Sequence, residues 1–174
     1  MRESRQGRQG RGDILPAMGA SSPRGHTTVH TGIQETELLT DRALVAKKLA
    51  WIESCVVELR TLARPEELRR DVRQQGFVKR TLQIAIQAAL DVATHIISDQ
   101  KLNEPEENRG AFAVVADAGW LPAHLADTLS RMDGFRNMLI YQDDEVDLAT
   151  VEEVLLYRLD DLLAFTAAIR ARIR

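Results

Sequence analysis

Four side chains in the second half of the chain could act together on a phosphate group. They are Arg136, Asn137, Tyr141 and Asp143, within the segment G-F-R-N-M-L-I-Y-Q-D-D-E-V-D that runs from Gly134 to Asp147. A guanidinium is planar and permanently charged, so it can hold two phosphate oxygens at once. The neighbouring amide can hydrogen-bond a phosphate, orient the arginine, or tie down nearby backbone. This signature segment therefore predicts a phosphate-binding site centred on Arg136.

The two remaining side chains are poorly suited to proton transfer. Histidine has a pKa of about 6.5, near cellular pH, whereas tyrosine has a pKa of about 10 and is a poor base there. Tyr141 can still donate a hydrogen bond or serve as an acid. On a continuous helix Asp143 lies about two turns after Arg136 and on the same side. Its carboxylate would repel a phosphate or pair with Arg136, in the same or another subunit, unless it belongs to a solvated turn before Asp147.

The bulk composition is that of an ordinary globular protein. The chain has 174 residues, of which 44% are hydrophobic and 28% are charged, which suits one domain with a real core. Its net charge of −3 means that contact with nucleic acid must come from a local patch. No apolar run approaches the roughly 18 residues that a membrane span needs. No signal peptide is recognisable at the start, so we expect a cytoplasmic protein without membrane contact.

No metal or cofactor site is expected. Cys55 is the single cysteine, which excludes an internal disulfide and a cysteine-based zinc site, and a place in the core of a helix explains it. No cluster of histidines and carboxylates has metal-ligand spacing, and no glycine-rich phosphate loop occurs. Asp91 and His95 stand one turn apart on a predicted helix, where a hydrogen bond between them explains both. If that helix faces the signature segment, these two are the candidate auxiliary groups of the site.

The elements that must position these residues are predicted to be helices. Residues 1–37 are rich in Gly, Arg, Ser and Thr with almost no large apolar side chains, so we expect a disordered tail. Its arginines could bind RNA weakly. Residues 38–174 form the predicted domain, in which apolar residues recur at spacings of three and four.

Caps and breakers divide this domain into expected helices. Thr40 or Asp41 caps the first, which ends near Arg64, and Gly76 separates the short second helix from the long third. Strand-like alternation is absent, so the predicted fold is an all-α antiparallel bundle. The expected helices cover residues 41–64, a short piece from Pro65, 77–101, a piece from Pro105 to Gly119, one from Pro122, and a last one capped by Asp147.

The signature segment resembles that of the HepT-like branch of the HEPN ribonuclease toxins, which usually reads G-F-R-N-x-L-V-H-x-Y-x-x-V-D. Two further stretches are similar to helices of that family: L-Q-I-A-I-Q-A-A-L-D-V-A-T-H-I-I, from Leu82 to Ile97, and R-L-D-D-L-L-A-F, from Arg158 to Phe165. The likeness covers residues 39–172. It implies a HEPN-like bundle that forms a homodimer, with the signature helices of the two subunits lining a shared positive cleft.

The resemblance also implies an activity and a partner. Active members of the family are metal-independent endoribonucleases that act as toxins, here expected on tRNA or mRNA. Their usual partner is an MNT-type nucleotidyltransferase antitoxin, which attaches AMP to the signature tyrosine. Arg136 and Asn137 match the family pattern, whereas Tyr141 stands at the histidine position and Asp143 at the tyrosine position.

These two departures change what is expected of the chain. Losing a positioned general base costs about 10² to 10⁴ in rate, so we expect a crippled or dead nuclease unless Tyr141 substitutes for the histidine. Asp143 has no phenol to accept AMP, so an antitoxin must act by binding or modify Tyr141 instead.

Three hypotheses stay open. The chain is an RNase toxin by descent, or a non-catalytic HEPN dimer that binds RNA or a nucleotidyltransferase antitoxin, or a disarmed form of an active toxin. A His-to-Tyr and a Tyr-to-Asp change each need only one base.

Overall fold

The computed structural model describes residues 29–107, 110–141 and 146–173, with side chains from residue 41 onward, and within these ranges every regular element is a helix. The predicted all-α fold is therefore confirmed. None of the described helices is long and apolar enough to cross a membrane. The elements are α1 (Val29–Leu62), the 3₁₀ helix η1 (Pro65–Glu67), α2 (Val72–Asp99), α3 (Ala111–Asp117), α4 (Ala123–Tyr141), α5 (Leu148–Tyr157) and α6 (Leu159–Arg172).

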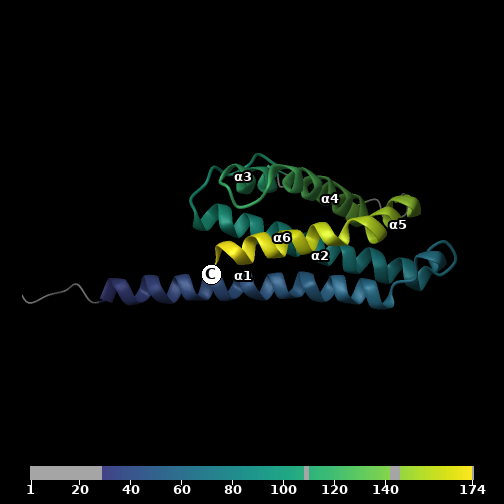
Figure 1. Ribbon diagram of the computed structural model, residues 1–174, viewed down its shortest axis with the longest axis horizontal. Helices are drawn as coiled ribbons and strands as arrows, with labels where there is room; N and C mark the ends of the chain where they lie inside the picture. Colours follow the sequence, from purple (N-terminus) through teal and green to yellow (C-terminus); the bar gives the residue numbers. More distant parts are fainter. Residues whose placement is uncertain (1–28, 108–109, 142–145, 174) are drawn as a thin grey trace, which may run out of the picture.

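Helix α2 is the central element of the bundle and contacts each of the other α-helices. Helix α1 packs along α2 and α6 on one side, and α3 and α4 cover the opposite side of α2 (Figure 1). The first turns of α1 extend beyond the other helices, while α5 lies at the far end beside α4 (Figure 1). This arrangement places α1 and α4, which carry the polar side chains of interest, on opposite faces of α2.

The core is built around alanines and branched residues on α2. Ala85, Ala89 and Ala93 are fully buried, and such small side chains let neighbouring helices approach closely. Phe112 of α3 and Phe165 of α6 are also fully buried and meet edge to face, with ring centroids 6.0 Å apart and an interplanar angle of 88°. This is a favourable geometry for two aromatic rings, and it joins α3 to α6.

Several predicted helix ends are confirmed. Asp147 caps α5, because its side chain accepts a hydrogen bond from the backbone N–H of Ala149 at 3.0 Å. Pro65 begins η1 as expected. The long helix begins earlier than predicted, at Val72, since the Asp71 side chain accepts from the N–H of Arg73 at 2.8 Å.

Four predicted boundaries are wrong. The helix expected from Pro105 begins only at Ala111. Helix α1 begins at Val29, well before Thr40, so residues 29–37 of the expected tail are helical, while residues 1–28 lie outside the described ranges. Gly76 lies inside α2, because burial of the helix face outweighs the roughly 0.5–1 kcal/mol that a mid-helix glycine costs. The expected last helix is divided at Arg158, whose φ of −116° interrupts the helical path between α5 and α6.

Cys55 lies in the core, as predicted. Burial, and after it the nearby Glu58 carboxylate, raises the pKa of the Cys55 thiol. The reactive thiolate is therefore scarce at neutral pH, and the cysteine serves as a small apolar core residue.

Gly119 ends α3 in the way that the sequence predicted. Its φ is +83°, its N–H donates to the carbonyl of Ala116 at 2.8 Å, and the next N–H, of Trp120, donates to the carbonyl of Val115 at 3.0 Å. This pair of bonds is a Schellman motif, which needs a left-handed residue at the position after the C-cap.

Substituting alanine at two glycines should move the stability in opposite directions. We expect Gly119→Ala to lower the free energy of unfolding by about 1–2 kcal/mol, since an L-residue is strained at positive φ. Gly76→Ala is the matched control and should raise it by about 0.5–1 kcal/mol, because an added Cβ in this helix meets nothing within 4 Å. Urea unfolding followed by circular dichroism measures both, and equal shifts of the same sign would contradict the assignment.

Candidate functional site

The first half of the signature segment lies on the last turns of α4. Gly134 does not interrupt this helix, which continues to Tyr141. Asp143 and the acidic residues that follow it, residues 144 and 145, lie outside the described residues, so what was expected of Asp143 stays a prediction. The described part of the site therefore consists of Arg136, Asn137 and Tyr141.

Arg136 is buried and is bound to a carboxylate of its own helix. Its Nη2 donates to Oδ1 of Asp133 at 2.7 Å and its Nε to the same oxygen at 3.1 Å. Asp133 is 0% exposed and Arg136 is 7% exposed. The second oxygen of Asp133, Oδ2, is buried and has no hydrogen-bond partner among the described residues. The guanidinium is therefore the counter-ion of a buried carboxylate.

This ion pair constrains what Arg136 can do. Removing one partner of a buried pair costs about 3–5 kcal/mol, because the other charge is left uncompensated. A phosphate that draws the guanidinium away from Asp133 must break this ion pair, and the cost of doing so weakens phosphate binding. Sequence reasoning missed Asp133, although its spacing of three residues from Arg136 is the one at which helical side chains meet.

Asn137 and Tyr141 face away from this pair. Asn137 is exposed, and Tyr141 is 81% exposed at the end of α4. Five positions along a helix correspond to a rotation of about 140°, so Arg136 and Tyr141 point in different directions. One chain alone does not bring these two side chains together.

A groove lies between α4 and α5, beside the signature segment. Its volume is about 660 Å³, and Arg136 does not line it. At its edge Arg158 approaches Glu153 at 3.6 Å, so part of its positive charge is neutralised. The lining residues are Thr128, Arg131, Met132, Gly134, Phe135 and Met138 of α4, with Thr150, Glu153 and Val154 of α5 and Arg158 at its end.

The predicted pairing of Asp91 with His95 is wrong. Asp91 accepts hydrogen bonds from Lys48 of α1 and from Gln87 of α2, each at 2.7 Å. The nearest carboxylate recorded for His95 is Asp41 of α1, whose Oδ1 is 3.7 Å from Nε2. Lys48 reaches Asp91 across the interface between α1 and α2 and offers it a full positive charge. The polar contacts of Asp91 and His95 are thus with residues of α1 and α2, and not with α4, which carries the signature segment.

In the part of the chain that the structure describes, no group of three or more histidines, cysteines or carboxylates is arranged to hold a metal ion.

We expect Arg136→Ala to lower the free energy of unfolding by about 3–5 kcal/mol, since it strands the Asp133 carboxylate in the core. The double variant Asp133→Leu, Arg136→Met should recover most of this loss, because an apolar pair of similar volume needs no counter-ion. Chemical unfolding of wild type, Asp133→Leu, Arg136→Met and the double variant gives the coupling energy. Additive losses would show that the two side chains stabilise the fold independently.

Comparison with known proteins identifies the family. A model described as "Ribonuclease HepT-like" matches residues 52–169. The mRNA nuclease HepT of Shewanella oneidensis is 28% identical over 129 residues, which cover 74% of this chain and 97% of that protein. The tRNA nuclease HepT of Aphanizomenon flos-aquae is 34% identical over 74 residues, or 42% of this chain and 50% of that protein.

A solved structure agrees with this assignment. The chain superposes on the tri-AMPylated Shewanella oneidensis HEPN toxin, solved in complex with an MNT antitoxin, with a TM-score of 0.69 and 28% identity. The match covers 74% of this chain and 97% of that one. The family model spans most of the described helices, including all of α4. The chain belongs to the ribonuclease HepT-like family.

Proposed function

We propose that this chain is the toxin component of a HEPN/MNT toxin–antitoxin pair, an endoribonuclease by descent whose cleaving centre is restrained in this form. The observation that carries the proposal is the position of Arg136 and Asn137 on the last turns of α4, in the segment that resembles the family signature and lies within the matched residues 52–169. The relatives named above are an mRNA nuclease and a tRNA nuclease, so RNA is the substrate class. The protein acts in the cytoplasm, where these RNAs are found.

Metal-independent RNA cleavage needs three groups. A base removes the proton of the ribose 2′-hydroxyl, a cation stabilises the charge of the pentavalent phosphate, and an acid protonates the leaving 5′-oxygen. Arg136 is the cation of this site, and Asn137 beside it contacts the phosphate. Tyr141 occupies the position of the family base, where it donates a hydrogen bond but accepts a proton poorly.

The Asp133 carboxylate restrains the site further. A guanidinium that is held by a carboxylate at 2.7 and 3.1 Å has much of its charge already compensated. It stabilises a phosphate less than a free guanidinium does, because the same positive charge serves both anions. Two features therefore lower the rate of RNA cleavage: the general base is missing, and Arg136 is already paired with Asp133.

The working form is a homodimer. Met138 and Ile140, on the same turns of α4 as Tyr141, are large apolar side chains that remain exposed in the single chain. Leu156 and Tyr157 at the end of α5 are exposed as well. Such surface is covered in a dimer, and a second copy of α4 there would bring two sets of signature side chains to one cleft.

An MNT-type nucleotidyltransferase is the second partner. The related Shewanella oneidensis toxin was solved in a tri-AMPylated form with its MNT antitoxin. In this chain the phenol of Tyr141 is 81% exposed at the end of a helix, within reach of a second protein. The partner either attaches AMP to Tyr141 or blocks the site by binding alone.

A second candidate is a dimer that binds RNA or its antitoxin without cutting. The burial of Arg136 against Asp133 favours it, since a binding module has no need of a free guanidinium in its cleft.

Cleavage of end-labelled tRNA and mRNA without added metal tests the proposal. We expect the variant Tyr141→His, Asp143→Tyr to cut RNA about 10²-fold faster than the unsubstituted protein, because it regains a positioned base. Adding Arg136→Lys is the matched control: it keeps the positive charge beside Asp133 but loses the planar guanidinium, so cutting should fall again while the fold survives.

Equal, measurable cleavage rates for the unsubstituted protein and the restored variant would show that the cleaving centre is not restrained. A restored variant that is folded and dimeric but cuts nothing would favour the binding module.

A further inference from the structure

A groove between α1 and α2 lies away from the signature helix and has the side chains of a nucleic-acid contact. Its volume is about 400 Å³, which is within the range of small-ligand pockets. We propose that it binds a nucleotide of single-stranded RNA, with the base stacked on Trp51 and the phosphates held by Arg80 and Lys47. This inference rests on the proposed function, because it supplies the nuclease with a second contact to its substrate.

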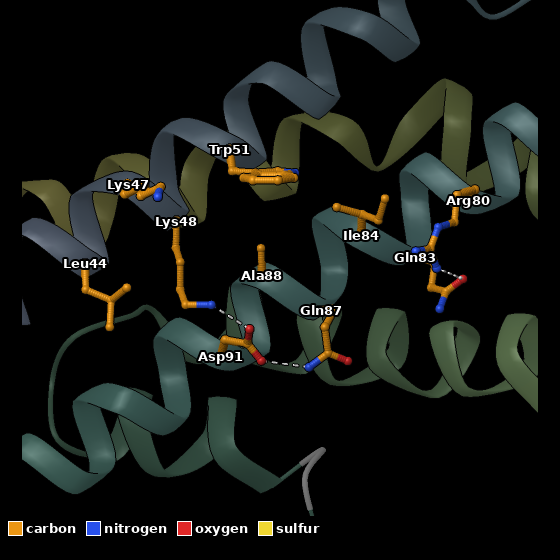
Figure 2. Close-up of a pocket in the computed structure, with 10 residues that line it drawn as sticks. All are labelled: Leu44, Lys47, Lys48, Trp51, Arg80, Gln83, Ile84, Gln87, Ala88 and Asp91. Atoms are coloured by element: carbon orange, nitrogen blue, oxygen red, sulfur yellow. Dashed lines mark hydrogen bonds and ion pairs between the residues drawn. The ribbon is translucent and has the colours of Figure 1, made fainter.

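Trp51 is the central feature of the groove. Its indole projects from α1 toward the side of α2 that carries Ile84 and Ala88 (Figure 2). It remains 54% exposed, although tryptophan is highly buried in most proteins. An indole with an open face is a stacking platform, and a nucleobase of any kind can cover it.

Two cations, Lys47 and Arg80, line the groove on different helices. Lys47 lies one turn before Trp51 on α1, and Arg80 lies one turn, about 6 Å, before Ile84 on α2. The hydrogen bond recorded for Arg80 is to the neutral amide of Gln83, at 3.3 Å, so that bond leaves the charge of the guanidinium uncompensated. A base stacked on Trp51 would therefore have Lys47 one turn away on α1, and on α2 it would have Arg80 one turn beyond Ile84.

The single carboxylate of the groove is already engaged. Oδ2 of Asp91 accepts from Lys48 and Oδ1 accepts from Gln87, each at 2.7 Å (Figure 2). Lys48 and Asp91 thus cancel, and the lining keeps the charges of Lys47 and Arg80. In a chain of net charge −3 this is a local basic patch, complementary to a polyanion.

The same features argue against a protein as occupant. The larger apolar side chains of the groove are Leu44, Trp51 and Ile84, a small area compared with a stable protein interface. The flanking cations would have to lose water against such a partner, whereas phosphates replace it.

Part of the groove, including Trp51, precedes residue 52, where the family match begins.

Fluorescence anisotropy with a labelled 2′-O-methyl oligoribonucleotide tests the groove on the full chain. The methyl groups block cleavage, so binding alone is measured. We expect Trp51→Leu to weaken binding about tenfold or more, because the stacked base loses its platform. Arg80→Gln should weaken binding. It should also lower the slope of log Kd against log salt concentration by about one, because one phosphate contact is lost.

Two matched controls accompany these variants. Trp120→Phe changes the other tryptophan, which lies between α3 and α4, and Lys101→Gln removes a charge about 30 Å from Arg80 along α2. Both should leave the affinity unchanged. Unchanged affinity in Trp51→Leu and Arg80→Gln would overturn the proposal. So would a Trp51→Leu variant whose sedimentation mass falls while its RNA affinity is kept, since the groove would then be a protein interface.

Cleavage measured in the Tyr141→His, Asp143→Tyr background separates this inference from the proposed function. Binding through Trp51 without any cleavage would sustain the groove and reject the nuclease. Cleavage with the same affinity before and after Trp51→Leu would sustain the nuclease and reject the groove.

Discussion

A carboxylate that has no exposed surface must find its counter-charge inside the protein, and for Asp133 that charge is the guanidinium of Arg136. The requirement is severe, because an unpaired buried charge costs several kcal/mol. It ties the arginine of the signature segment to the packing of α4 against the bundle. The arginine to which we assign the phosphate contact is thus also a side chain on which the fold depends. The burial of Arg136 follows from this pairing, whereas its separation from Tyr141 follows from the five-residue spacing of the two on α4.

In this member of the HepT-like family, the described side chains of the signature segment do not lie together. Arg136 faces inward to Asp133, whereas Asn137 and Tyr141 face solvent on the same helix. A second copy of α4 and an RNA strand would have to meet at the exposed turns for the site to form. The basic groove around Trp51 lies between α1 and α2, away from α4, so the RNA contact that we propose there is separate from the signature segment.

Much of the fold could be predicted from local chemistry. The Asp147 cap, the Pro65 start and the left-handed Gly119 depend on the backbone at one position, and residue type alone reveals them. Gly76 and the Lys48–Asp91 pair were beyond such reasoning, because tertiary packing decides whether a helix tolerates a glycine and which helix a carboxylate faces. The site was predictable to the same extent. Spacing and resemblance indicated Arg136, but its burial, and hence the importance of Asp133, depends on how α4 packs.

We infer that Asp133 withholds the charge of Arg136 from RNA. The most direct measurement adds Asp133→Asn to the variant that carries Tyr141→His and Asp143→Tyr, and compares the single-turnover cleavage rates of the two proteins. Asparagine can still accept a hydrogen bond from the guanidinium but lacks the negative charge of aspartate, so the triple variant should cleave faster. Loss of cleavage in a triple variant that stays folded would contradict it, and would make Asp133 the group that positions Arg136 for catalysis.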